Sequence, residues 1–183
     1  MKNLMPIAAA LAVSAALHAQ SVMFSNEGRD VFANTWIYDA DGTTRLSGTA
    51  FWVELYLVGP GNSLTPLGSP INFLTGAKSG LFYDPIPRIA PLPANSIATF
   101  EVLAWEAPSL TFAAAQTTPG AKWGGAPAVT LFLGNDSAGD PPVGLVGLQS
   151  FAIIPNGLLP IPEPATFALG AMGLGAFLLR RWS

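Results

Sequence analysis

The segment Thr49-Ala-Phe-Trp-Val-Glu-Leu-Tyr-Leu-Val58 alternates in a way that decides the fold class. In an extended chain, successive side chains point to opposite faces. One face of this segment then carries Phe51, Val53, Leu55 and Leu57. The other face carries Trp52, Glu54 and Tyr56. The pattern predicts a β-strand that is covered on at least one side.

Residues 97–106 repeat the alternation, with Ala98, Phe100, Val102 and Ala104 on one face. Shorter candidate strands occupy residues 22–25, 31–38, 67–73, 80–83, 128–133 and 148–154. Glycine, proline and asparagine separate these segments, and such residues form turns. Only residues 109–116 favour a helix, with Ser109 as its N-cap. We therefore predict an all-β domain over residues 20–155, an antiparallel β-sandwich of jelly-roll or immunoglobulin-like connectivity.

Composition excludes several kinds of site in this domain. Between residues 20 and 160 there are five basic and ten acidic residues, so no basic stripe exists to bind nucleic acid. The chain has no cysteine, and its one histidine is His18. If His18 is removed with a leader peptide, then Ser-His-Asp and Cys-His nucleophiles and ordinary zinc sites are excluded. We predict no enzyme activity, no cofactor and no metal centre.

The first nineteen residues have the pattern of a secretory signal peptide. Lys2 is followed by an apolar stretch over residues 4–17, and Ala19 is a small residue at the expected cleavage position. The alternative is a retained N-terminal anchor helix, but the apolar stretch is shorter than the ~20 residues that a membrane span needs. We expect an exported protein.

The C-terminal end has a different character. Residues 156–164 carry alternating prolines, which favour an extended linker over sheet or helix. Residues 165–179 contain no charge, and Arg180 and Arg181 follow them. The pattern predicts a short transmembrane helix over residues 165–183 whose arginines stay on the cytoplasmic side. The alternative is a buried C-terminal helix, but core helices usually have a polar face.

These C-terminal residues resemble a known family. The tripeptide Pro162-Glu163-Pro164, the apolar span and the pair Arg180-Arg181 are similar to the PEP-CTERM sorting signal of Gram-negative bacteria. The resemblance implies an exosortase, a membrane enzyme that cuts near the tripeptide, as a partner. It also implies a path from an inner-membrane intermediate to the cell surface or extracellular matrix. Residues 53–61 and 145–151 also resemble uncharacterised members of this group.

The aromatic residues of the two best strands suggest a second role. Trp52, Tyr56 and Trp105 fall on the more mixed faces of these strands, where neighbouring strands could align them. Such a platform could contact exopolysaccharide, and the runner-up function is a carbohydrate-binding module. The alternative is that these side chains fill the space between sheets.

Acidic residues give two weaker hypotheses. Glu54, Glu101 and Glu106 lie in strong strand patterns, and a close pair of carboxylates can hydrolyse glycosides. Solvent-facing strand positions also explain them. Asp39 and Asp41 resemble the start of a calcium loop, but no glutamate closes it, and an Asp-Gly turn explains the pattern as well. Residues 135–140 form a second acidic loop.

Overall fold

The computed structural model describes residues 20–31, 34–109 and 111–156. The predicted signal peptide at residues 1–19 lies outside these residues, and so do the predicted membrane helix and all but the first residue of the linker. Among the helices that the structure describes, none is both long enough and apolar enough to span a membrane.

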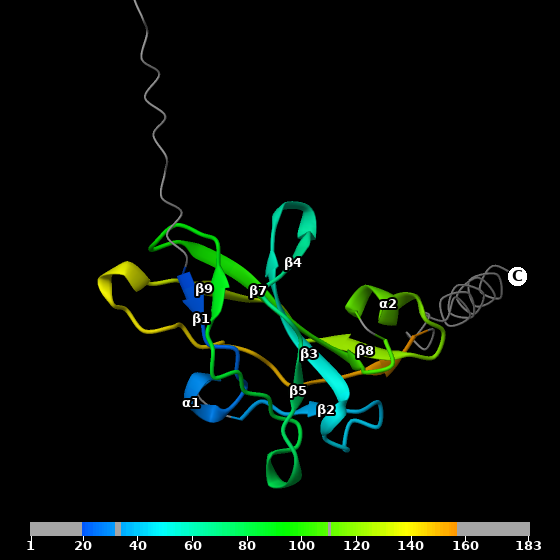
Figure 1. Ribbon diagram of the computed structural model, residues 1–183. Coiled ribbons are helices and arrows are strands. Elements are labelled where there is room, and N and C mark those ends of the chain that lie inside the picture. Colours follow the sequence, from blue (N-terminus) through cyan, green and yellow to red (C-terminus); the bar gives the residue numbers. More distant parts are fainter. Residues whose placement is uncertain (1–19, 32–33, 110, 157–183) are drawn as a thin grey trace, which may run out of the picture.

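Two long strands form the centre of the domain. β3 (Gly48–Val58) and β7 (Ile97–Glu106) run antiparallel, in a register that places Phe51 opposite Glu106 and Val58 opposite Thr99. They cross the middle of the molecule in Figure 1. Each was predicted from its alternation alone, and both predictions are confirmed.

Short strands extend this pair into a seven-stranded sheet with the order β11-β8-β7-β3-β4. β4 (Leu64–Pro66) and β5 (Ile71–Phe73) share the free edge of β3. β8 (Lys122–Gly125) and β9 (Val129–Phe132) share the free edge of β7. β11 (Ile154–Pro155) then pairs with β8. All these pairings are antiparallel.

The other strands of the described residues form two smaller sheets of two strands each. β1 (Gln20–Val22) pairs antiparallel with β6 (Arg88–Ala90). β2 (Ile37–Tyr38) pairs with β10 (Phe151–Ala152), and this pair is parallel. The domain is therefore all-β and mainly antiparallel, as the sequence predicted, but the β2–β10 pair and an isolated bridge between Val22 and Val143 are parallel, which the sequence did not predict.

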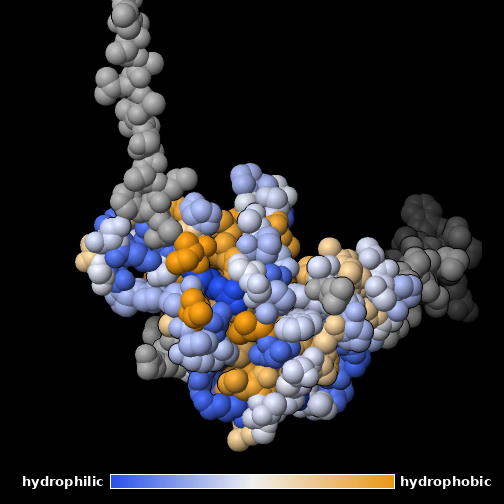
Figure 2. All heavy atoms as spheres, in the orientation of Figure 1, coloured by the Kyte–Doolittle hydropathy of each residue, from blue (hydrophilic) through white to orange (hydrophobic). Residues whose placement is uncertain are grey.

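The main core lies against one face of the central sheet. That face consists of the alternating residues predicted to be apolar, and their neighbours come from the smaller sheets and the loops. Fully buried members of this core are Val22, Phe24, Ile37, Val53, Leu55, Phe82, Ala90, Phe100, Val102, Ala104, Leu133, Leu145 and Ile153. Burying one such large side chain contributes ~1.5–3 kcal/mol. On the face of the molecule seen in Figure 2, apolar surface is divided into separate patches among polar residues.

In the described residues, one predicted strand is shorter than expected and another is reduced to a single bridge, and a buried side chain takes up backbone hydrogen bonds in both regions. Residues 31–38 were predicted as a strand, but α1 (Gly28–Val31) precedes a strand of only two residues. Residues 80–83 form only an isolated bridge between Tyr83 and Ser25. The side-chain amide of Asn26 donates to the carbonyl oxygens of Thr35 and Gly80 and accepts from the N–H of Phe82. One asparagine thus replaces part of a strand ladder, which alternation cannot predict.

The predicted helix exists but begins later than expected. α2 (Phe112–Thr117) is capped by Thr111, whose hydroxyl accepts a hydrogen bond from the N–H of Ala114 at 3.2 Å. The prediction of Ser109 as N-cap is wrong. The carbonyl oxygen of Ser109 instead accepts a bond from the indole N–H of Trp105 at 2.9 Å, so this residue holds the preceding strand in place.

The sequence pattern predicts the remaining turns and short strands only in part. Among the described residues, 3₁₀ turns span Pro60–Asn62, Gly76–Lys78 and Asp136–Ala138. The sequence pattern did not predict β6 or β8. Prolines flank β6 and a Gly-Gly pair ends β8, and both features disfavour strands. Both segments form strands because they pair with strands distant in sequence, β6 with β1 and β8 with β7.

Candidate functional site

The three candidate glycan-contact residues lie together on the second face of the central sheet. Trp52 and Trp105 are directly opposite each other in the β3–β7 register. Tyr56 lies on the same face as Trp52, four residues along β3. The alternation predicted this shared face, and the structure brings the three side chains into one cluster.

Helix α2 covers this cluster. The ring of Phe112 lies 6.1 Å from that of Tyr56, 5.9 Å from that of Trp105 and 5.4 Å from that of Trp123. Trp105 is 0% exposed and Tyr56 is 8% exposed, whereas Trp52 is half-buried. Trp105 therefore presents no surface to a sugar in this arrangement. The three residues act here as a second core beneath α2.

Sequence reasoning did not include Phe112 or Trp123 in this cluster. Phe112 is the first residue of a six-residue helix, which is too short to show a helical period. Trp123 precedes Gly124 and Gly125, so its strand shows no alternation. The aromatic character of Phe112 and Trp123 was the one feature of the sequence that could have indicated their place in the cluster.

The carboxylates divide between two places. Glu54 is 8% exposed and accepts a hydrogen bond from the hydroxyl of Tyr56. Glu101 lies directly opposite Tyr56 on β7, on the same face. Burial raises the pKa of both carboxyl groups, and burial also raises the pKa of Tyr56. The structure thus places both carboxyl groups near one tyrosine, Glu54 two residues away on β3 and Glu101 opposite it on β7.

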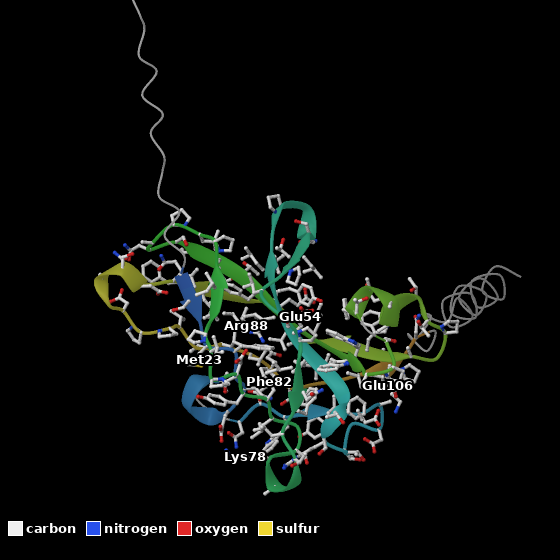
Figure 3. All side chains as sticks on the ribbon, in the orientation of Figure 1. Met23, Glu54, Lys78, Phe82, Arg88 and Glu106 are labelled. Atoms are coloured by element: carbon white, nitrogen blue, oxygen red, sulfur yellow. The ribbon has the colours of Figure 1, made fainter. Side chains whose placement is uncertain are left out.

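Glu106 lies apart from this pair, near β8 and α2 (Figure 3). Its Oε2 accepts the backbone N–H of Lys122 at 3.2 Å, and its Oε1 lies 3.8 Å from the Lys122 ammonium. The Lys122 ammonium also donates to both oxygens of Asp39, at 2.7 and 2.9 Å. The hydrogen bond to Asp39 is the main reason that the pKa of Lys122 is raised. These contacts attach β8 to the loop before β3.

In each acidic loop, one carboxylate accepts hydrogen bonds from residues of its own loop. Asp41 accepts hydrogen bonds from the hydroxyl and backbone N–H of Thr44 and from the N–H of Thr43, which lower its pKa. Asp140 accepts from the N–H of Asn135 at 2.7 Å. Within residues 20–31, 34–109 and 111–156, no three His, Cys, Asp or Glu side chains gather in a possible metal site. The Asp-Gly segment is a turn closed by its own aspartate.

The described surface includes a larger and a smaller hollow. The larger, about 530 Å³, lies beside α2 and is lined by Glu106, Pro108, Ser109, Ala114, Thr118, Gly120 and Ala121. The smaller, about 310 Å³, lies where the Asp84–Arg88 ion pair of 2.7 Å meets Leu67 and Gly68. No tryptophan or tyrosine lines either hollow. The aromatic side chains expected to contact a sugar therefore lie in neither hollow.

The residues of the sorting motif lie outside the described part of the chain. These are Pro162, Glu163, Pro164, Arg180 and Arg181. Comparison of the whole chain with protein-family models, with curated proteins and with solved structures finds no match.

Proposed function

We propose that this chain is an exported, non-catalytic component of the cell surface or extracellular matrix of a Gram-negative bacterium. The observation that carries the proposal is the order of features at the C-terminal end: the tripeptide Pro162-Glu163-Pro164, then the apolar residues 165–179, then Arg180 and Arg181. An exosortase would recognise this segment while it is held in the inner membrane, cut it and release the domain to the surface.

The arrangement of the domain supports a separable tail. Ile153 is fully buried, and Asn156, the last described residue, donates its N–H to the carbonyl oxygen of Ala121 at 2.8 Å. The Asn156 side-chain amide donates to the carbonyl oxygens of Gln116 and Thr118. Asn156 is thus held to the domain by three hydrogen bonds immediately before residue 157.

The proposal extends to the fold and the surface chemistry. We infer a β-sandwich in which the central sheet forms one layer and the two small sheets contribute to the other, because their apolar residues share one core. A structural role is supported because Trp105, Tyr56 and Glu54 are buried and Tyr56 donates a hydrogen bond to Glu54. Their burial gives no support to exopolysaccharide contact through this cluster.

Mass spectrometry of the mature surface protein tests the proposal. In cells that contain the processing enzyme, we expect a chain that begins at Gln20 and ends near Pro162-Glu163-Pro164. Glu163→Gln should leave the full-length protein in the inner membrane, and Arg180→Ser with Arg181→Ser should disturb its orientation. Glu27→Gln, a glutamate change within the domain, is the matched control and should be processed normally. A mature chain that still ends at Ser183 would overturn the sorting proposal.

A further inference from the structure

The larger hollow adjoins the point where the chain leaves the described domain. Asn156 bonds to the carbonyl oxygens of Thr118 and Ala121, and both residues line the hollow. The chain therefore leaves the domain at the rim of this groove. Twenty-seven residues of the sequence, 157–183, follow it.

The register of the last strand pair points along the same rim. Ile154 lies opposite Trp123, Pro155 opposite Lys122, and Asn156 bonds to Ala121. One more antiparallel step would set residue 157 opposite Gly120, which also lines the groove. A Cβ atom added to Gly120 would meet nothing within 4 Å, so there is open space beside it.

The groove and the next residues have matching chemistry. Pro108, Ala114 and Ala121 form its apolar part. The sequence after Asn156 is Gly157-Leu158-Leu159-Pro160-Ile161, which is uncharged and apolar. Leu158 is two residues from Asn156, and two residues reach at most ~7 Å. Its side chain can therefore fill this groove and cannot reach a distant one.

We propose that the groove beside α2 binds the segment 157–161 of the same chain, with a leucine side chain against Ala114. This goes beyond the sorting proposal, because it assigns a docking surface on the domain itself. Docking would hold the tripeptide that starts at Pro162 within ~14 Å of the groove, since Pro162 comes four positions after Leu158. The domain would then keep the tripeptide close to α2.

Cysteine pairs test the contact, since the chain contains no cysteine of its own. Full-length protein carrying Ala114→Cys and Leu158→Cys should form an intramolecular disulfide at least tenfold faster than protein carrying Ala113→Cys and Leu158→Cys. Ala113 is the exposed neighbour of Ala114 on α2 and does not line the groove. A freely moving tail would reach both positions equally. Equal rates, or disulfides only between two chains, would overturn the proposal.

A second experiment fills the groove in full-length protein without cysteines. Ala114→Trp should increase the rate of limited proteolysis after Leu158 about tenfold, whereas Ala113→Trp should leave it unchanged. Equal rates in the two variants would contradict docking. Both experiments use purified protein without a processing enzyme, so their failure would leave the sorting proposal standing, and failure of processing in cells would leave the docking proposal standing.

Discussion

The hydroxyl of Tyr56 donates a hydrogen bond to the carboxylate of Glu54, and each residue is only 8% exposed. A charged carboxylate is costly to bury, so burial raises the pKa of Glu54 above its ordinary value of 4.5. The folded state then binds this proton more tightly than the unfolded state does. The free energy of unfolding should therefore fall as the pH rises from about 4.5 through the raised pKa of the folded protein.

Glu54→Gln should remove the contribution of this group to the pH dependence, because the neutral amide still accepts the tyrosine hydrogen bond. We expect the variant to be at least as stable as the native domain at pH 8. Glu54→Ala should instead lose ~1–3 kcal/mol, because the Tyr56 hydroxyl loses its partner. Urea unfolding between pH 4 and pH 8 measures both effects. An unchanged pH slope in Glu54→Gln would contradict the assignment.

Trp105 should behave as a core residue. Trp105→Ala removes a fully buried ring and its bond to the Ser109 carbonyl oxygen, and we expect a loss of ~3–5 kcal/mol. Phe132→Ala is the control, because Phe132 is 60% exposed on β9 and should change stability by less than ~1 kcal/mol. Thermal unfolding of the two variants compares them. Similar losses in both would show that burial beneath α2 does not matter.

Asn26 should be among the most sensitive polar positions. It is fully buried and bonds to Thr35, Gly80 and Phe82, so Asn26→Ala removes three buried hydrogen bonds. The Gly80 oxygen keeps the N–H of Ile37, whereas the N–H of Phe82 loses the side-chain oxygen that it bonds to. At ~1–3 kcal/mol for the N–H of Phe82 and ~1 kcal/mol for each of the other two lost bonds, the variant should be largely unfolded. Asn72→Ala, which loses one partly buried bond to Phe51, should lose only ~1 kcal/mol. Circular dichroism of the two proteins distinguishes these outcomes.

Adjacent glycines in β8 should tolerate alanine differently. A Cβ at Gly124 would lie 2.5 Å from the carbonyl oxygen of Ala152, which belongs to the backbone of β10 and cannot move alone. A Cβ at Gly125 would lie 2.5 Å from a methyl group of Leu103, which can rotate. We expect Gly124→Ala to lose ~3 kcal/mol and Gly125→Ala ~1 kcal/mol in chemical denaturation. The reverse order would show that β8 and β10 are not in close contact.

The ion pair between Arg88 and Asp84 should matter more than an exposed pair. Its side chains are 11% and 13% exposed, and the guanidinium also donates to the Ser69 carbonyl oxygen at 2.7 Å. Arg88→Ala leaves a nearly buried carboxylate without its cation, which should destabilise the domain by ~3 kcal/mol. Lys78→Ala breaks an exposed pair with Glu27 and should lose less than ~1 kcal/mol. Salt titration provides a further check, because only the exposed pair should be strongly screened.

The sequence by itself determined the two central strands, their apolar face and the mainly β character of the domain. The alternation in residues 49–58 and 97–106 is a local property, since successive side chains of any extended chain point to opposite faces. The Asp41-Gly42 turn was equally predictable, because it depends on residues within one loop.

Only the tertiary structure decided which second-face residues are covered. Trp105 is buried because Phe112, seven residues later in the chain, folds back over it at 5.9 Å. The short strands likewise depend on partners that are distant in sequence, as in the parallel pairing of Ile37 with Phe151. A two-residue strand has too few side chains to show alternation. Its pairing is set by which chain segments the core brings together, and that information is not local.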